Sequence, residues 1–208
     1  MTYSKVASIV APDISALDES TLSLSEAAAL HATGLFDEAY YLQANADVRG
    51  SGMDAAEHFC RHGWREMRHP NQYFDLAWYL QQLPRAERAD ENPVMHYARV
   101  GEQLGLRPTL FFDPLWYRAR YRLPVDQSPL RHYLTHVRSG KFSPNGEFDV
   151  EAYLGRNPKI RAAGVDPFMH YLKRNFGVGP DSTPDVRSQA YAAMRLATWE
   201  KRRRKIPC

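Results

Sequence analysis

The chain has 208 residues, of which 44% are hydrophobic and 25% charged, a length and balance typical of a folded chain of one domain or two small ones. The formal net charge of +3 is too small to indicate a nucleic-acid-binding protein by itself. Two cysteines, Cys60 and Cys208, make no disulfide framework, so they do not fix the compartment. The apolar residues 6–11 are too few to span a membrane, and we expect neither a secretory signal peptide nor a transmembrane segment.

The N-terminal region is expected to hold one helix. Residues 1–22 have no clear periodicity and are predicted to form an arm. Residues 23–34 predict a short helix, with Ser25 as a candidate N-cap and Gly34 as a left-handed residue at its end. This helix would cover the open end of the array that follows.

Residues 35–180 contain four copies of one pattern, which predicts a tandem helical array. A Phe-Asp pair followed by aromatic residues begins each copy, and a His-aromatic pair comes later in the same copy. The copies, called here units one to four, occupy residues 35–72, 73–110, 111–146 and 147–180. Their Phe-Asp segments are Phe36–Leu42, Phe74–Leu80, Phe112–Arg118 and Phe148–Leu154, and their aligned histidines are His58, His96, His132 and His170.

Each unit is expected to form two short helices. The aspartate of the Phe-Asp pair suits an N-cap, because its carboxylate can accept hydrogen bonds from the free N–H groups of the first turn. The second helix also begins at a capping residue, and we predict that Gly63 and Gly101 end it in a left-handed conformation in units one and two. The candidate N-caps are Asp37, Asp75, Asp113 and Asp149 for the first helices, and Asp54, Asn92, Ser128 and Asp166 for the second helices.

Residues 181–208 are predicted to form a linker, a helix over residues 188–199 and a basic tail. We expect the helix to pack on unit four as a second cap, with Tyr191, Met194, Leu196 and Trp199 on or near one face. The tail consists of Lys201, Arg202, Arg203, Arg204 and Lys205. Two interpretations stay open for it: a solubilising terminus, or a contact for nucleic acid, anionic lipid or an acidic partner.

Single units resemble a bacterial repeat family whose units read Phe-Asp-x-x-Tyr-Tyr-Leu, Asn-Pro-Asp-Val, Gly-x-Asp-Pro-x-x-His-Tyr, Gly and Arg-x-Pro. Residues 45–48 and 164–171 match best, and the resemblance covers about residues 35–180. Such units occur beside glycosyltransferase domains of surface-polysaccharide synthesis and in large secreted or surface proteins. The resemblance implies a helical module in a bacterial, polysaccharide-related setting, and it carries no catalytic residues.

The aligned histidines are interpreted mainly as packing residues, each with one ring nitrogen hydrogen-bonded to a neighbouring backbone group. One histidine per unit would leave them too far apart to share a metal ion. Two pairs at i, i+4 spacing, His58 with His62 and His132 with His136, lack an obvious third ligand. We therefore predict no metal site, and we expect no cofactor.

Two kinds of surface are candidates for binding. Aromatic residues at helical spacing predict the core, but exposed rings among them would suit stacking on sugar rings. A basic face along the array would suit a repeating acidic polymer, and the alternative is a solvated, salt-bridged surface. The candidate contacts with a polysaccharide or a partner protein are Arg65, Arg68, Arg107, Arg118, Arg120, Arg122, Arg138 and Lys141.

The sequence has no phosphate-binding glycine loop, nucleophile elbow or zinc-finger spacing, which favours a binding protein over an enzyme. We expect an all-α repeat protein that engages bacterial surface or capsular polysaccharide. It would serve in adhesion at a cell surface, or as a spike of a phage-like particle released by a non-classical route. The alternative is an intracellular accessory that docks on glycosyltransferases of polysaccharide synthesis. Oligomerisation is compatible with both.

Overall fold

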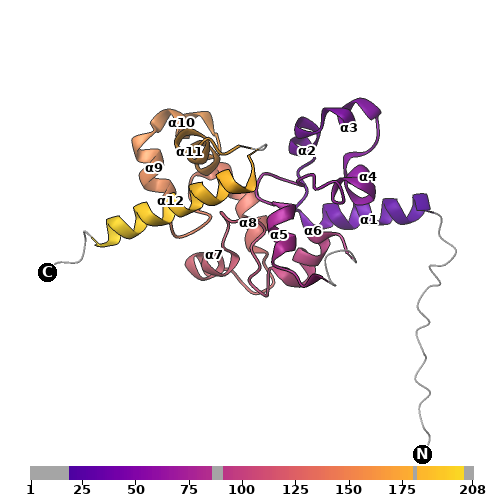
Figure 1. The fold of residues 1–208 in the computed structure, drawn as a ribbon, viewed down its shortest axis with the longest axis horizontal. Coiled ribbons are helices and arrows are strands. Elements are labelled where there is room, and N and C mark those ends of the chain that lie inside the picture. Colours follow the sequence, from indigo (N-terminus) through magenta and orange to yellow (C-terminus); the bar gives the residue numbers. More distant parts are fainter. Residues whose placement is uncertain (1–18, 86–90, 180–181, 204–208) are drawn as a thin grey trace, which may run out of the picture.

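A computed structural model describes residues 19–85, 91–179 and 182–203, and this part of the chain contains helices and no strand, which confirms the all-α prediction (Figure 1). In chain order the α-helices are α1 (Glu19–Thr33), α2 (Glu38–Ala44), α3 (Ala46–Ser51), α4 (Ala55–His58), α5 (Leu76–Gln81), α6 (Pro93–His96), α7 (Pro114–Tyr121), α8 (Pro129–His136), α9 (Val150–Arg156), α10 (Pro158–Ala163), α11 (Pro167–Phe176) and α12 (Pro184–Arg203). Short turns extend the second helices of units one to three: η2 (Phe59–Gly63) and η4 (Tyr97–Gly101) are π-helical, and η5 (Val137–Ser139) is a 3-10 turn.

The predicted capping residues begin the two main helices of every unit. In the first helices, Oδ1 of the aspartate accepts a hydrogen bond of 2.9–3.0 Å from the backbone N–H three residues on. In the second helices, the capping side chains accept from backbone N–H groups two or three residues on. Each cap satisfies an N–H group that has no acceptor within its helix. The repeated motif therefore specifies where helices start.

The phenylalanine before each aspartate packs back onto its own helix. Its ring centroid lies 5.2–5.4 Å from that of the tyrosine five residues on, in all four units. This pair fixes the angle at which the chain enters the helix, as a hydrophobic staple does. The same tyrosines are buried and form part of one continuous aromatic core.

Units one and four hold one helix more than expected, because their connectors are helical. The additional helices α3 and α10 follow Asn45 and Asn157, and each ends at a glycine with positive φ, Gly52 at 75° and Gly164 at 60°. Unit three is two residues shorter between its Phe-Asp and His-aromatic motifs. It joins α7 to α8 by a loop in which Arg122 is left-handed, with φ 53°.

Gly63 and Gly101 do not end helices in the left-handed conformation, so that prediction is wrong. Both are the last residues of the π-helical turns but have no positive φ, which occurs four residues later, at Met67 (59°) and Gly105 (78°). A Cβ atom at Gly63 would lie 2.1 Å from the hydroxyl oxygen of Tyr41, and the equivalent distance at Gly101 is also 2.1 Å. Glycine is needed here because a tyrosine hydroxyl occupies the space of a side chain.

Hydrogen bonds close each unit and join units to one another. In units one to three, the N–H of the capping aspartate donates to the carbonyl oxygen of the proline near the unit's end, at 2.8–3.2 Å. Between units, the hydroxyl of Tyr73 lies 3.0 Å from that of Tyr133 and donates to Oδ2 of Asp166 at 2.7 Å. All three side chains are buried. Residues of units two, three and four therefore meet in one internal polar cluster.

The long helices α1 and α12 pack across several units. α1 begins at Glu19, before the predicted start, so Ser25 lies inside it and is not its N-cap, whereas Gly34 follows its end with φ 67° as predicted. It packs against α4, η2 and α6 of units one and two. α12 contacts α11 of unit four, and its Arg187 also pairs with Asp75 of unit two at 3.6 Å. Among the described helices, none has both the length and the apolar character that a membrane crossing requires.

Candidate functional site: a groove beside helix α12

The aligned histidines have a structural role. In every unit, Nδ1 of the histidine lies 2.6–2.9 Å from the hydroxyl oxygen of the first-helix tyrosine. The partner is a side chain of the same unit, not the backbone group that we expected. Burial lowers the pKa of His58 and His132, which favours the neutral ring. Within the described residues, no group of three or more His, Cys, Asp or Glu side chains is placed to hold a metal ion.

Two of the predicted basic contacts form ion pairs with carboxylates of the same chain. Arg68 donates two hydrogen bonds of 2.8 Å to Asp47 and one of 2.6 Å to Glu66. Its guanidinium lowers the pKa of Asp47 to about 2. Arg107 pairs with Asp113 and donates to the hydroxyl of a tyrosine of α12 at 2.8 Å. These two cations hold parts of the chain together. Their carboxylate partners offset their positive charge, so they attract an acidic polymer less strongly.

The other predicted basic contacts have several different environments. The guanidinium of Arg65 lies over the ring of Trp64, 4.1 Å from its centroid. Arg118 donates to the backbone carbonyl of Pro124. Arg122, Arg138 and Lys141 are exposed. Of the basic tail, Lys201, Arg202 and Arg203 belong to the last turn of α12, whereas Arg204 and Lys205 lie outside the described residues.

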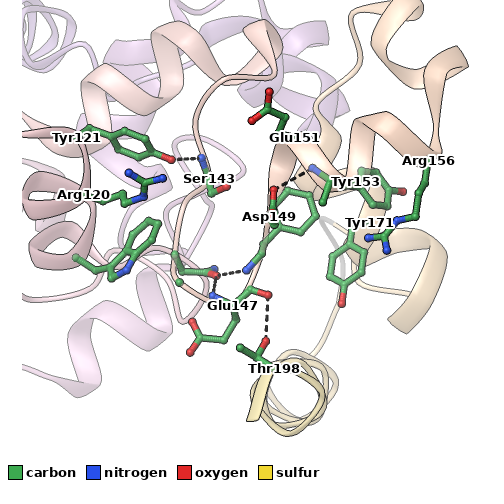
Figure 2. A pocket seen from close by; sticks show the side chains of 15 residues that line it. Arg120, Tyr121, Ser143, Glu147, Asp149, Glu151, Tyr153, Arg156, Tyr171 and Thr198 are labelled. Carbon is green, nitrogen blue, oxygen red and sulfur yellow. Dashed lines mark hydrogen bonds between the residues drawn. The ribbon is translucent and has the colours of Figure 1, made fainter. Parts of the chain in front are cut away.

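A groove of about 610 Å³ lies between units three and four and is bordered by α12 (Figure 2). Five aromatic residues line it, and two of them, Phe148 and Tyr153, are buried. The other three, Trp116 and Tyr121 of α7 and Tyr171 of α11, are only partly buried, so they remain accessible to a ligand. The fourth unit has Ala152 where Trp116 stands in the third, and this small side chain also lines the groove.

Charged side chains of both signs line the same groove. Arg120 of α7 and Arg156 of α9 lie on opposite sides of it in Figure 2, and both are exposed. Glu147 lies near α12, and Glu151 belongs to α9. Guanidinium groups donate and carboxylates accept hydrogen bonds, so together they can bind a ligand rich in hydroxyl groups.

Hydrogen bonds hold the turn that separates the two units and connect it to α12. Oδ1 of Asn145 accepts from the N–H of Glu147 at 3.0 Å, and the N–H of Ser143 donates to the hydroxyl of Tyr121 at 2.7 Å. The hydroxyl of Thr198 donates to the carbonyl oxygen of Glu147 at 3.2 Å. These bonds, drawn as dashed lines in Figure 2, fix one wall of the groove relative to the other.

A second hollow, of about 480 Å³, adjoins the first, because Trp116, Gly146 and Glu147 line both. Its other lining residues include Trp78, which is the equivalent of Trp116 in unit two, and Arg195 of α12. We call the two hollows together the α12 groove. It places two tryptophans from successive units, with arginines and carboxylates, beside the same helix.

Most residues of the α12 groove were not predicted as contacts; of the basic candidates, Arg107 and Arg120 line it. One sequence feature could have indicated the groove: the residue three positions after the aspartate of the Phe-Asp pair. This position holds an aromatic residue in units one to three but Ala152 in unit four, where the missing ring leaves space. Compared with models of known protein families, with curated proteins and with solved structures, the chain matches none. The resemblance of single units to a bacterial repeat family therefore stays a prediction.

Proposed function

We propose that this protein is a non-catalytic binding protein that engages bacterial surface polysaccharide through the α12 groove. The main support is that the partly open rings of Trp116, Tyr121 and Tyr171 line one hollow together with charged side chains of both signs. Aromatic rings offer faces on which the C–H surface of a sugar ring can stack, and the charged groups around them can hydrogen-bond its hydroxyls. Protein sites for small ligands combine apolar walls and a few polar groups in this way.

The shape of the α12 groove favours a polymer over an isolated small molecule. Its two hollows share Trp116 and Glu147, so one chain can lie across both with Trp116 in the middle. The binding free energies from the two hollows would then combine, as they do for two linked binding sites. The mixture of arginines and carboxylates suits a neutral polymer, or one with few charges, better than a densely acidic one.

The setting that we propose is a cell surface or a released particle, where capsular or related polysaccharide is accessible. It is supported by the resemblance of single units to those of secreted and surface proteins. Fractionation of the producing cells tests it: we expect the protein on cells, on particles or in the medium. Recovery from the cytoplasm together with a glycosyltransferase would favour the accessory role in synthesis instead.

The binding proposal is tested by presenting the purified protein to an array of bacterial surface glycans. We expect the wild type to bind at least one glycan. The double variant Arg120→Ala/Arg156→Ala should bind it about tenfold or more weakly, because each change removes a charged hydrogen-bond donor. Both side chains are exposed, so the fold should be retained, and circular dichroism verifies this.

The matched control is Arg138→Ala/Lys141→Ala, which removes the same charge from two exposed residues that do not line the α12 groove. It should bind like the wild type. Weakening by the control, with no effect of the groove variant, would assign binding to a basic face. Absence of binding to every acidic and neutral glycan would contradict the proposal itself.

A further inference from the structure

The outward face of α12 carries apolar side chains that the α12 groove does not use. On the inner face of this helix, Ala190 and Met194 are buried. Leu196 and Trp199 lie on the opposite side of the helix from Met194 and are 57% and 55% exposed. The expectation that they share one packed face with Met194 is therefore wrong. With Arg203, they follow the spacing of three and four residues that places side chains on one side of a helix.

The same end of α12 is strongly basic. From residue 195 to its end at Arg203 the helix includes four Lys or Arg and one acid, Glu200, and the sequence continues with Arg204 and Lys205, which lie outside the described residues. The guanidinium of Arg203 lies over the ring of Trp199, 5.4 Å from its centroid. Thr198 still hydrogen-bonds to the body of the protein, but beyond it Trp199, Glu200 and Arg203 are exposed. In Figure 1 this end of the helix projects past α9, away from the other helices.

We propose that the distal face of α12, formed by Leu196, Trp199 and Arg203 at the basic end of the helix, is a docking site for an anionic lipid membrane. Tryptophan and leucine beside Lys and Arg are typical of helices that lie in the interface of a bilayer. The ring of Trp199 would occupy the headgroup region, and Leu196 would enter the edge of the acyl chains. The cations would neutralise anionic headgroups. The contact would be peripheral, reversible and sensitive to salt.

Charge and chemistry favour a membrane over the other partners. A second copy of the chain, related by a two-fold axis along this face, would bring two basic segments together, and like charges oppose such contacts. Nucleic acid would explain the cations and a stacking role for Trp199. It would leave the exposed Leu196 without a role. A lipid surface is the partner that uses both the apolar and the basic side chains.

The test is co-sedimentation of the full-length protein with vesicles. We expect binding to vesicles made of equal parts of phosphatidylcholine and phosphatidylglycerol, and little binding to phosphatidylcholine alone. Replacing Arg202 and Arg203 by Gln should weaken binding about fivefold for each cation removed. The emission of Trp199, taken as the difference between the wild type and Trp199→Phe, should shift to shorter wavelength on binding.

The decisive variant is Leu196→Ser/Trp199→Ser, which should bind the mixed vesicles about tenfold or more weakly, because its apolar contacts are lost. Its matched control is Leu104→Ser/Val125→Ser, since these side chains are 71% and 82% exposed elsewhere on the surface. The proposal is overturned by equal binding to both kinds of vesicle, by no binding to either, or by an unchanged Leu196→Ser/Trp199→Ser variant. A DNA duplex that binds where vesicles do not would assign the basic end to nucleic acid.

Discussion

Units one and two differ from units three and four in how the second helix ends, although the same tyrosine–histidine hydrogen bond forms in all of them. In the first pair, a glycine follows the histidine by five residues and is the last residue of a π-helical turn. In the second pair this position holds Val137 and Asn175, and the helix ends in a 3-10 turn or continues as a regular α-helix. The bond measures 2.6–2.9 Å throughout. The side-chain pair is thus constant, and the backbone adapts to it.

The largest expected effect comes from filling the space beside the tyrosine hydroxyl in unit two. We predict that Gly101→Ala lowers the free energy of unfolding by about 3 kcal/mol, because overpacking a buried site forces side chains or backbone to move. The new Cβ would lie 2.1 Å from the Tyr79 hydroxyl oxygen. Urea unfolding measures the change. Placing alanine at the aligned position of unit three, Val137→Ala, removes side-chain atoms instead of adding them and should cost only about 1–2 kcal/mol.

A second substitution separates steric crowding from other effects of Gly101→Ala. Removing the hydroxyl with Tyr79→Phe in the same chain should restore part of the lost stability, since the atom that crowds the new methyl group is gone. A loss below about 0.5 kcal/mol for Gly101→Ala, the size of an ordinary surface change, would contradict the steric role of this glycine.

The N-caps of the second helices differ between the first and the last unit. Asp54 is exposed, whereas Asp166 is buried and receives the Tyr73 hydroxyl. Burial raises the pKa of Asp166 from 3.8 to about 6. Below about pH 4 the carboxyl is protonated in both the folded and the unfolded state. Between about pH 4 and pH 6 the carboxyl is ionised in the unfolded chain but still protonated in the folded one, so this group increasingly opposes folding as the pH rises; above about pH 6 the effect levels off.

We therefore predict that Asp166→Asn flattens the pH dependence of stability. The difference in unfolding free energy between variant and wild type should move in favour of the variant by up to about 3 kcal/mol from pH 4 to pH 7, at about 1.4 kcal/mol per pKa unit. Urea unfolding across this range measures it, and Asp54→Asn is the exposed control. Parallel pH profiles for the wild type and Asp166→Asn would show that the carboxyl titrates normally.

The smallest of these effects concerns the left-handed residue that follows the second helix in units one and two. Unit one has Met67 at φ 59°, where unit two has Gly105 at φ 78°. A side chain disfavours this conformation, and Met67 is 48% exposed, so little packing is lost on replacing it. We predict that Met67→Gly stabilises the protein by about 0.5–1 kcal/mol in thermal or urea unfolding. A destabilised variant would mean that the contacts of the Met67 side chain stabilise the fold more than its left-handed backbone destabilises it.

The sequence predicts those features that depend on near neighbours. Asp37 and Asp149 are recognisable as caps because their partners are the N–H groups of the next turn. The role of Gly101 was missed because the hydroxyl that excludes a side chain belongs to Tyr79, in another helix. The α12 groove was missed for the same reason. Its rings and charges come from different units, and only tertiary packing brings them to one helix.

Binding of polysaccharide in the α12 groove is tested most directly through the indole N–H signals of the four tryptophans, followed by NMR during titration with glycan fragments. Trp116 lines both hollows of the groove, whereas Trp64 lies outside it and donates from Nε1 to the Cys60 carbonyl at 3.0 Å. We predict that a glycan selected on the array shifts the Trp116 signal in a saturable way and leaves the Trp64 signal in place. A bound glycan that leaves the Trp116 signal unchanged would contradict the assignment of this groove as the binding site.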